Sequence, residues 1–293
     1  MGSVRIALAA AAAAVVTACS GPATSADSQA NTGLASYYLA LGDSLSQGVQ
    51  PNAAGVSVET EQGYADQLYA ALHSSYPALR LVKLGCPGES TRTMINGGIC
   101  RYPGGSQLTA ATAFLRAHRD HVLLVTIDIG ANDAEDCGSW AGLRSLGSCF
   151  GTSVPDAVTN LATIMNRLDA ADPGVRIVGM SYYLPALAEW RDGTTGQAIA
   201  RLSERLAAVY NNLLERVYTE SGARVADVFG AFDTSNFGDR VTVPGMGQVP
   251  RNVALICQWT WQCAAPPRGP NQHANETGYG VIARTFLDAA GLS

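Results

Sequence analysis

The sequence predicts an α/β protein of the three-layer, flavodoxin-like type, built on a five-stranded parallel sheet. Short apolar runs alternate along the chain with longer stretches in which apolar residues recur at helical spacing. One of these runs, Val122–Ile129, is nearly continuous in apolar residues, as a parallel strand covered on both faces should be. Strict alternation of strand and helix implies parallel strands joined by right-handed crossovers.

Residues 1–18 are expected to be a signal peptide that is not part of the fold. Arg5 supplies a positive charge, and Ile6–Val16 is an apolar stretch too short to span a bilayer as a mature helix. The sequence from Val16 to Cys19 resembles a bacterial lipobox, which implies that Cys19 is acylated and becomes the mature N-terminus. The alternative is an ordinary cleaved signal. Either way the protein is expected to be exported, and it is either lipid-anchored at the outer face of the cell membrane or secreted.

Residues 19–35 are rich in Ser, Ala, Thr and Gly and are expected to form a flexible tether. The folded domain is expected to cover residues 36–293, a length that suits one α/β domain with its own core.

Five strands and five helices are expected within this domain. The strands are predicted at Tyr37–Leu41, Leu79–Lys83, Val122–Ile129, Arg176–Met180 and Arg224–Asp227. The helices are predicted at Gly63–Ser74, Gln107–His118, Ser153–Ala170, Gly196–Ser221 and Asn275–Ala290. The fourth helix carries an apolar stripe that is predicted to face the core: Ile199, Leu202, Leu206, Val209, Tyr210, Leu213 and Val217.

Long irregular segments are predicted after four of the strands, at Leu84–Ser106, Ala131–Thr152, Ser181–Thr195 and Val228–Gln272. Segments that follow parallel strands gather at one edge of the sheet, which is where ligands bind in open α/β sheets. Long loops without secondary structure of their own are often functional. The functional site is therefore expected at this edge.

The cysteine content indicates disulfides. There are seven cysteines, and six remain when Cys19 is set aside as the anchor. An even number in an exported protein favours disulfides, and the spacing favours sequential pairs that each close a short loop. The predicted pairs are Cys86–Cys100, Cys137–Cys149 and Cys257–Cys263. A zinc site is the rival interpretation, but no CxxC pair or suitable histidine spacing supports it, and no metal or cofactor is expected.

The charge balance argues against nucleic acid as a partner. The chain has 19 basic and 24 acidic residues, a formal net charge of −5, and no basic run. One expected partner is the membrane, reached through the N-terminal anchor. The protein is expected to be a monomer.

Ser44 is the candidate nucleophile. It follows the first predicted strand in Gly42-Asp43-Ser44, so the turn presents it at the carboxyl edge of the sheet, and Gly42 and Gly48 permit unusual backbone angles there. By itself this pattern also fits a simple strand-ending turn. We interpret Asp43 as an organiser of the turn.

His273 is the candidate base for Ser44. The chain has four histidines, and three of them, His73, His118 and His121, are expected near the opposite, amino-terminal edge of the sheet. His273 ends the last long segment, just before the closing helix, which returns it to the edge of Ser44.

An oxyanion hole requires neutral donors aimed at one point. Gly88, in the segment after the second strand, offers a backbone N–H, and Asn132, after the third strand, offers an amide.

Together these motifs resemble the four blocks of the GDSL, or SGNH, hydrolases. The blocks are Gly42-Asp-Ser-Leu45, Gly88, Gly130-Ala-Asn-Asp133 and His273-Ala-Asn-Glu-Thr-Gly-Tyr279. The cysteine layout and the segment Trp259–Cys263 look closest to the secreted actinobacterial lipase and esterase branch. The resemblance implies the SGNH hydrolase fold over residues 36–293, with Ser44 as nucleophile and His273 as base. It also implies an oxyanion hole made by the Ser44 and Gly88 N–H groups and the Asn132 side chain.

The last block departs from the family pattern in one place. The family usually has Asp three residues before the histidine, and here that residue is Pro270. Some members use a backbone carbonyl to orient the imidazole, so we predict that the Pro270 carbonyl accepts from His273 in a Ser–His dyad. Asn271 and Asp233 are the rival acceptors.

The predicted function is hydrolysis of carboxylic esters by an exported lipase or esterase with an acyl-enzyme intermediate. An unperturbed His273, with a pKa near 6.5, predicts activity that rises through about neutral pH. Lipid or short-chain esters are the favoured substrates, and an acetyl-esterase or acyltransferase acting on envelope glycans or lipids is the alternative. A non-catalytic, lipid-anchored binding protein is the alternative of another class. The apolar residues predicted near the mouth of the site are Met94, Ile95, Trp140, Leu143, Leu184, Trp190, Trp259 and Trp261.

Overall fold

Five parallel strands form the central sheet of the computed structural model, which describes residues 37–135 and 152–292. The strands are β1 (Tyr37–Gly42), β4 (Arg80–Lys83), β5 (Val122–Asp128), β6 (Ile177–Met180) and β7 (Arg224–Ala226). Their spatial order is β4-β1-β5-β6-β7, and every neighbouring pair is parallel. In chain order this is 2-1-3-4-5, the flavodoxin-like order, so the predicted fold class is confirmed.

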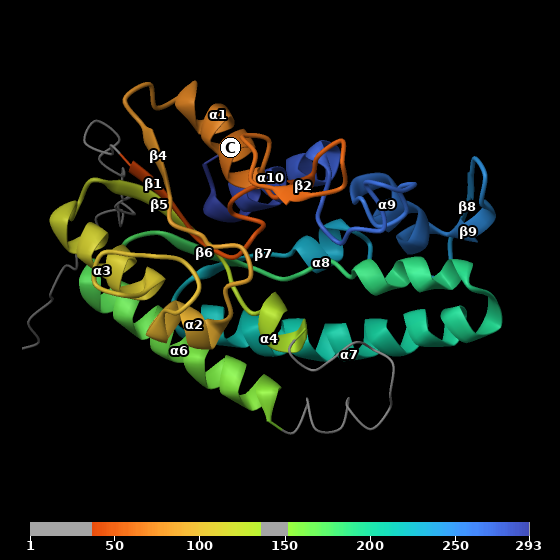
Figure 1. Ribbon diagram of the computed structural model, residues 1–293. Helices are drawn as coiled ribbons and strands as arrows, with labels where there is room; N and C mark the ends of the chain where they lie inside the picture. The colour runs from red at the N-terminus through yellow and green to blue at the C-terminus, as the bar shows by residue number, and fades with distance from the viewer. Residues whose placement is uncertain (1–36, 136–151, 293) are drawn as a thin grey trace, which may run out of the picture. The chain divides into compact units, whose positions relative to one another are not determined.

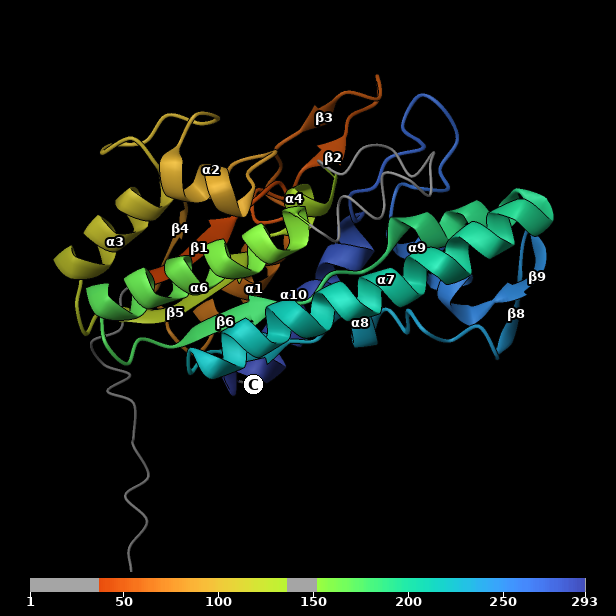
Figure 2. The same ribbon diagram turned by 90° about the horizontal axis from the view of Figure 1, so that it is seen from below.

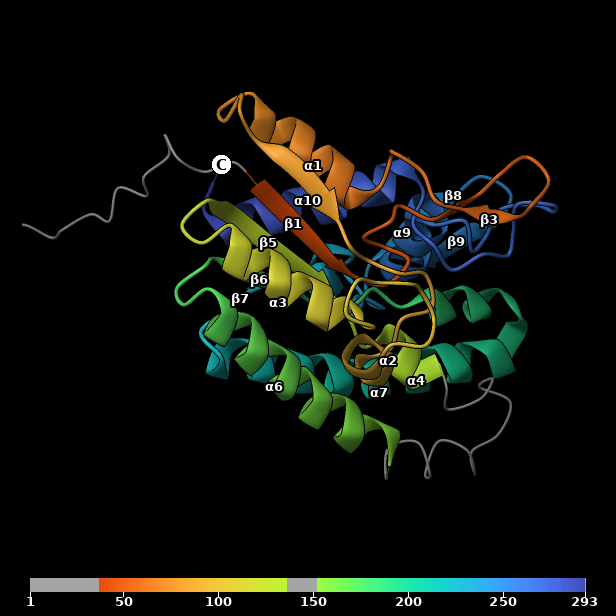
Figure 3. The ribbon, with the colours of Figure 1, turned by 60° about the vertical axis from the view of Figure 1, so that its left-hand side comes forward.

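Helices cover both faces of this sheet and make the three layers (Figure 1). Helices α1 (Tyr64–His73) and α10 (Glu276–Ala290) lie on one face. Helices α3 (Gln107–Ala117), α6 (Ser153–Ala171) and α7 (Gly193–Glu220) lie on the other, as Figures 2 and 3 show. All five helices were expected from the sequence, and their bounds agree within three residues.

Helices α1 and α10 pack through residues that recur at helical spacing. In α1, Tyr64, Leu68 and Leu72 recur every four residues and are buried. The ring of Tyr64 stacks on Phe286 of α10 with 4.7 Å between centroids. This contact joins the first and last helices of the domain on the same face of the sheet.

The apolar stripe predicted for α7 is only partly correct. Tyr210 and Val217 are buried, but Leu202 and Val209 are 38% and 51% exposed. The polar residue Asn211 is buried instead, because its amide donates to the Tyr182 carbonyl and accepts from the Tyr182 N–H. The buried face of α7 therefore includes a polar residue whose side chain bonds backbone groups, and an apolar stripe in the sequence does not reveal such a residue.

Each of the four segments predicted as irregular contains at least one short helix or strand. In Ala131–Thr152 only residues 131–135 and 152 are described. The elements are α2 (Thr91–Asn96), α4 (Ala131–Glu135), the 3-10 helix η1 (Pro185–Arg191), α8 (Val228–Ala231), β8 (Arg240–Val243), β9 (Gly247–Pro250) and α9 (Arg251–Trp259). A small antiparallel pair, β2 (Gln50–Pro51) with β3 (Ser57–Val58), follows β1. The irregular assignment of Val228–Gln272 was wrong for its middle part, which forms the β8–β9 hairpin and helix α9.

Two of the predicted disulfides are present. Cys86–Cys100 has its sulfur atoms 2.03 Å apart, and Cys257–Cys263 closes the shorter loop. The Cys137–Cys149 pair, the signal peptide, Cys19 and the tether lie outside the described residues. Across 37–135 and 152–292, no helix has the length and apolarity to cross a bilayer.

Candidate active site

Ser44 lies at the carboxyl end of β1, on a turn whose backbone conformation requires glycine at position 42. Gly42 has a φ of +132°, and a Cβ there would lie 2.1 Å from the Asp128 carbonyl oxygen on neighbouring β5. The buried amide of Gln107 accepts from the Gly42 N–H at 2.7 Å and donates to the Gly42 carbonyl at 2.9 Å. Gln107 thus fixes the end of β1, a role that was not predicted from the sequence.

Two buried carboxyl groups accept hydrogen bonds from backbone N–H groups of this turn. Asp128 Oδ2 accepts from the N–H groups of Asp43 at 3.2 Å and Ser46 at 3.3 Å. Asp43 Oδ1 in turn accepts from the Leu45 N–H at 3.0 Å. Burial, and next the neighbouring Asp43 charge, raise the pKa of Asp128 well above its usual range, which favours its protonated form.

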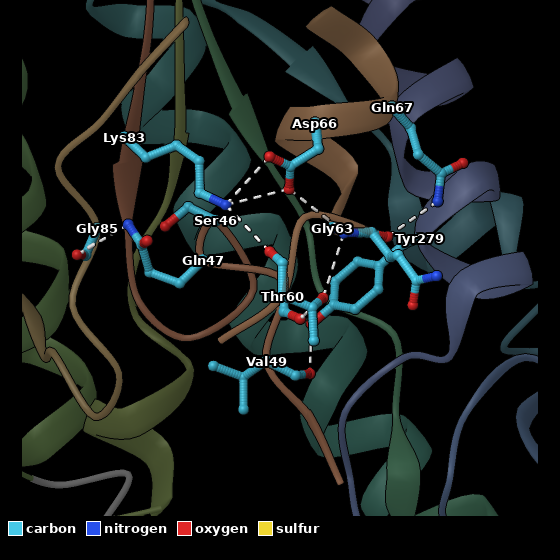
Figure 4. Close-up of polar contacts among 12 residues, drawn as sticks. Ser46, Gln47, Val49, Thr60, Gly63, Asp66, Gln67, Lys83, Gly85 and Tyr279 are labelled. Carbon is cyan, nitrogen blue, oxygen red and sulfur yellow. Dashed lines mark hydrogen bonds and ion pairs between the residues drawn. The ribbon is translucent and has the colours of Figure 1, made fainter. Parts of the chain in front are cut away.

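The loop that continues from Ser44 is anchored to three other elements (Figure 4). Lys83, at the end of β4, donates to both carboxylate oxygens of Asp66 on α1, at 3.2 and 3.1 Å, and to the Thr60 carbonyl at 3.2 Å. The Tyr279 hydroxyl of α10 donates to the Val49 carbonyl at 2.9 Å. The loop that follows Ser44 is therefore held by β4, α1 and α10 together.

His273 reaches Ser44 from the loop between α9 and α10. Its Nε2 lies 3.0 Å from the Ser44 hydroxyl oxygen, although the two residues are 229 positions apart. Three backbone contacts hold this loop: the Trp261 N–H donates to the His273 carbonyl, the Asn271 N–H donates to the Trp261 carbonyl, and the Tyr183 hydroxyl donates to the Gln272 carbonyl. The pair predicted from the sequence therefore lies within hydrogen-bonding distance.

The acceptor for the other ring nitrogen of His273 is not the one expected. Asn271 Oδ1 lies 2.8 Å from Nδ1 and also accepts from the His273 backbone N–H at 3.0 Å. The Pro270 carbonyl was the predicted acceptor, so that assignment is wrong, and the rival Asn271 takes the position. The other rival, Asp233, pairs with Arg251 at 2.9 Å.

The His273 imidazole is more acidic than the sequence analysis assumed. Burial lowers its pKa to about 4, because a positive charge on the ring is poorly solvated and Asn271 brings no opposing charge. The expectation of a base near pKa 6.5 is therefore corrected, since the ring is neutral throughout the neutral range.

Gly88 lies on a β-turn from Cys86 to Glu89. The Glu89 N–H donates to the Cys86 carbonyl at 3.0 Å, Pro87 occupies the second position and Gly88 the third, with a φ of +83°. Proline and glycine at these positions are typical of a type II turn, which requires positive φ at its third residue. The Cys86–Cys100 disulfide starts at the first residue of the turn and restricts it further.

Asn132, in α4, is positioned by the same turn. Its Nδ2 donates to the Glu89 carbonyl at 2.8 Å, which uses one of its two amide hydrogens and fixes the plane of the amide. Asn132 lines the same cavity as Ser44 and His273. The second amide hydrogen is the donor that remains for a ligand.

The cavity at Ser44 has a volume of about 80 Å³. The residues lining it are Asp43, Ser44, Leu45, Ala131, Asn132, Tyr182, Tyr183, Pro185, Gln272 and His273. Tyr182 and Tyr183 were not named from the sequence, although they directly follow a predicted strand whose end faces this edge. Of the apolar residues expected near the mouth, Met94 and Trp190 are buried in the core. Trp140 and Leu143 lie outside the described residues.

Comparison with known proteins identifies the family of the chain. Residues 40–245 match the profile of the GDSL-like lipase/acylhydrolase family, and the chain belongs to that family. The matched segment contains Ser44, Gly88 and Asn132. No curated protein matches the chain.

Solved structures with a similar fold include two from Streptomyces. The extracellular lipase from Streptomyces rimosus has a TM-score of 0.58 at 18% identity, over 87% of this chain and 100% of that one. Phospholipase A1 from Streptomyces albidoflavus NA297 has a TM-score of 0.54 at 18% identity, over 87% and 99%. An acetyl xylan esterase from Geobacillus stearothermophilus has a TM-score of 0.51 at 16% identity, over 87% and 94%. These likenesses show the fold.

Proposed function

We propose that the chain is an exported serine esterase that cleaves carboxylic esters through an acyl-enzyme intermediate on Ser44. The observation that carries the proposal is the 3.0 Å hydrogen bond between the Ser44 hydroxyl and His273 Nε2. A hydroxyl is a weak nucleophile unless an adjacent base accepts its proton, and this arrangement provides that base. Membership of the GDSL-like lipase/acylhydrolase family supports the same chemistry.

In the proposed first step, His273 Nε2 accepts the proton of Ser44 as the serine oxygen attacks the ester carbonyl. The resulting oxyanion accepts hydrogen bonds from the Ser44 and Gly88 N–H groups and from the second amide hydrogen of Asn132. Collapse of the tetrahedral intermediate expels the alcohol, which takes the proton from His273. Water then attacks the acyl-enzyme, with His273 again as base, and releases the acid.

Asn271 is the positioning residue in this proposal. With its Oδ1 2.8 Å from Nδ1, the Nδ1–H tautomer is favoured and Nε2 is left free to accept the serine proton. The Ser44–His273 pair thus works as a dyad oriented by an amide rather than as a triad with a carboxylate.

We further propose lipid or short-chain esters as substrates and place the chain in the secreted actinobacterial branch of the family. The walls of the Ser44 cavity include Leu45, Tyr182, Tyr183 and Pro185, which suit an apolar acyl group. The Streptomyces neighbours, a lipase and a phospholipase, support this choice of substrate class. Hydrolysis rates for a series of p-nitrophenyl esters of increasing acyl length test the preference directly.

Anchoring through acylated Cys19 is part of the same proposal and is supported by the lipobox-like sequence. Replacing Cys19 by Ser should release the protein from the membrane fraction into the medium, and metabolic labelling with a radioactive fatty acid should be lost. Continued labelling of the Cys19→Ser variant would contradict the anchor.

A serine-directed phosphonate tests the catalytic proposal. It should label the protein on one residue and abolish esterase activity, and Ser44→Ala should remain unlabelled while keeping its circular dichroism spectrum. Asn132→Ala should label slowly and lose about 10²–10³-fold in kcat, the usual loss for one oxyanion donor. Undiminished esterase activity in Ser44→Ala would refute the proposal, and absence of activity and labelling in the intact protein would favour a binding function.

A further inference from the structure

A second cavity lies far along the chain from Ser44, between the β8–β9 hairpin and helix α9. Its volume is about 630 Å³, within the range of about 300–1,000 Å³ that is typical of small-molecule sites. It shares no lining residue with the cavity at Ser44. The mechanism proposed for Ser44 gives this cavity no role.

One wall of the cavity is apolar. Val241 and Val243 alternate along β8, so both side chains project from the same face of the hairpin. Met246 extends this wall from the turn, where its N–H donates to the Val243 carbonyl at 3.0 Å. Leu255 of α9 also lines the cavity, and the Cys257–Cys263 disulfide joins α9 to the loop that follows it.

The charged residues of the lining are all of one sign. Arg191, at the end of η1, and Arg251, at the start of α9, line the cavity, and no aspartate or glutamate does. Asp233 accepts from Arg251 Nε at 2.9 Å, which leaves the two terminal nitrogens of that guanidinium for another acceptor. Arg191 is exposed and forms no ion pair within the described part of the chain.

We propose that this cavity is a binding site for a single-chain anionic amphiphile. The alkyl chain lies against Val241, Val243 and Met246, and the carboxylate or phosphate head is bound by Arg191 and Arg251. Guanidinium groups suit both heads, because they donate paired hydrogen bonds to two oxygens of either anion. The proposal does not rest on the esterase function, since binding at this site needs neither Ser44 nor His273.

Isothermal titration calorimetry of the full chain tests the proposal. The ligands are dodecanoate, dodecyl phosphate, dodecanol and dodecyltrimethylammonium, each below its micelle concentration, and the protein carries Ser44→Ala so that no ester chemistry contributes heat. We expect dodecanoate or dodecyl phosphate to bind at least about tenfold more tightly than the neutral and cationic ligands. The tighter of the two anions identifies the head group as a fatty acid or a phosphate.

Two variants locate the binding. Arg191→Glu should weaken anion binding at least about tenfold, and Met246→Asp should weaken it by a similar factor through the apolar wall. Arg167→Glu is the matched control: it makes the same charge reversal at an exposed position of α6 and should bind like the parent. Melting temperatures of all three variants should stay near the parent value, which separates loss of the site from loss of the fold.

A photoreactive fatty acid provides the independent localisation. Cross-linking followed by peptide mapping should label the β8–β9 hairpin or α9. Labels confined to the Ser44 cavity would overturn the proposal, as would equal affinity for dodecanol and dodecanoate. Unchanged binding in both Arg191→Glu and Met246→Asp would also overturn it.

Discussion

His273 can act as a base only in one tautomer, and an amide rather than a carboxylate selects it. Asn271 Oδ1 accepts from Nδ1, and the amide itself is fixed because its Nδ2 donates to Ser57 Oγ at 3.0 Å. An amide orients the ring without placing a negative charge beside it. This difference explains why burial alone sets the low pKa of His273.

Replacing Asn271 by Ala should therefore reduce kcat by about 10²-fold, the lower part of the range that a positioned general base contributes. KM should change little, because Asn271 does not line the cavity at Ser44. Steady-state kinetics on a short-chain ester measure both values. Asp233→Asn is the control and should retain nearly full activity, and a comparable loss in that variant would show that the acid, not the amide, orients the ring.

The pH dependence of kcat/KM should follow the lowered pKa of His273. The base is active when neutral, so activity should rise with pH through about 4 and be flat from about pH 5 to 8. Asn271→Asp adds a negative charge beside the ring, which favours the imidazolium and should move the acid limb to higher pH. A profile of the parent that rises through pH 6 to 7 would show that the ring is better solvated than the structure indicates.

The polar residues of the site could be named from the sequence because each follows a predicted strand or precedes a predicted helix. The position of a residue at the end of a strand or the start of a helix determines at which edge of the sheet it lies. Ser44 and His273 lie together at the same edge. The partner of Nδ1 could not be chosen in this way. Pro270, Asn271 and Asp233 all lie in one segment, and only the backbone path of that segment decides which oxygen faces the ring.

Among the elements, β1, β4 and α1 depend on one another through the loop that follows Ser44. Lys83 and Asp66 form an ion pair whose side chains are only 18% and 16% exposed, and Lys83 also binds the Thr60 carbonyl. Removal of the lysine leaves a partly buried carboxylate without its partner, which is more destabilising than loss of an exposed pair.

Lys83→Met should therefore lower the free energy of unfolding by about 1–2 kcal/mol, between the values for exposed and fully buried pairs. Urea denaturation followed by circular dichroism measures the change. Arg251→Met removes the exposed pair with Asp233, whose side chains are 48% and 39% exposed, and serves as the matched control. A loss in Lys83→Met no larger than in Arg251→Met would mean that the buried pair does not anchor the loop.

Long periodic elements were predictable, whereas short elements within proline- and glycine-rich segments were not. The five sheet strands coincide with short apolar runs, and the five long helices coincide with stretches in which apolar residues recur at helical spacing. The β8–β9 hairpin has strands of only four residues. In β8 exposed and half-buried side chains alternate, whereas β9 does not alternate at all, so the pattern is too weak to assign. Its turn, Val243-Pro-Gly-Met246, nevertheless has proline and glycine at the positions typical of a type II turn, and that signal was available.

At the scale of the whole molecule, the order of the elements was sufficient to predict the fold. Alternating strands and helices with right-handed crossovers leave few arrangements, and all the segments that follow strands meet at one edge. The site could therefore be expected at that edge from the sequence alone. The second cavity could not be predicted in this way, because the hairpin and helix α9 that line it belong to a segment predicted to be irregular.

The carboxyl pair beneath Ser44 has a consequence for the molecule as a whole. Because the pKa of Asp128 is raised in the fold, its contribution to stability is complete below the unfolded value of about 3.9 and is lost as pH rises through the folded value. Between these two values, folding should be accompanied by uptake of a proton from solvent, and the protein should become less stable as the pH rises.

Denaturant titrations at several pH values measure this effect. The free energy of unfolding of the parent should decline with increasing pH relative to Asp128→Asn, whose amide stays uncharged. Parallel curves for the two proteins would mean that Asp128 ionises freely. If the curves diverge, the turn that carries Ser44 depends on an acid that must remain undissociated, and a rise in pH through the folded pKa of Asp128 would destabilise the protein while the His273 imidazole is still neutral and able to accept a proton.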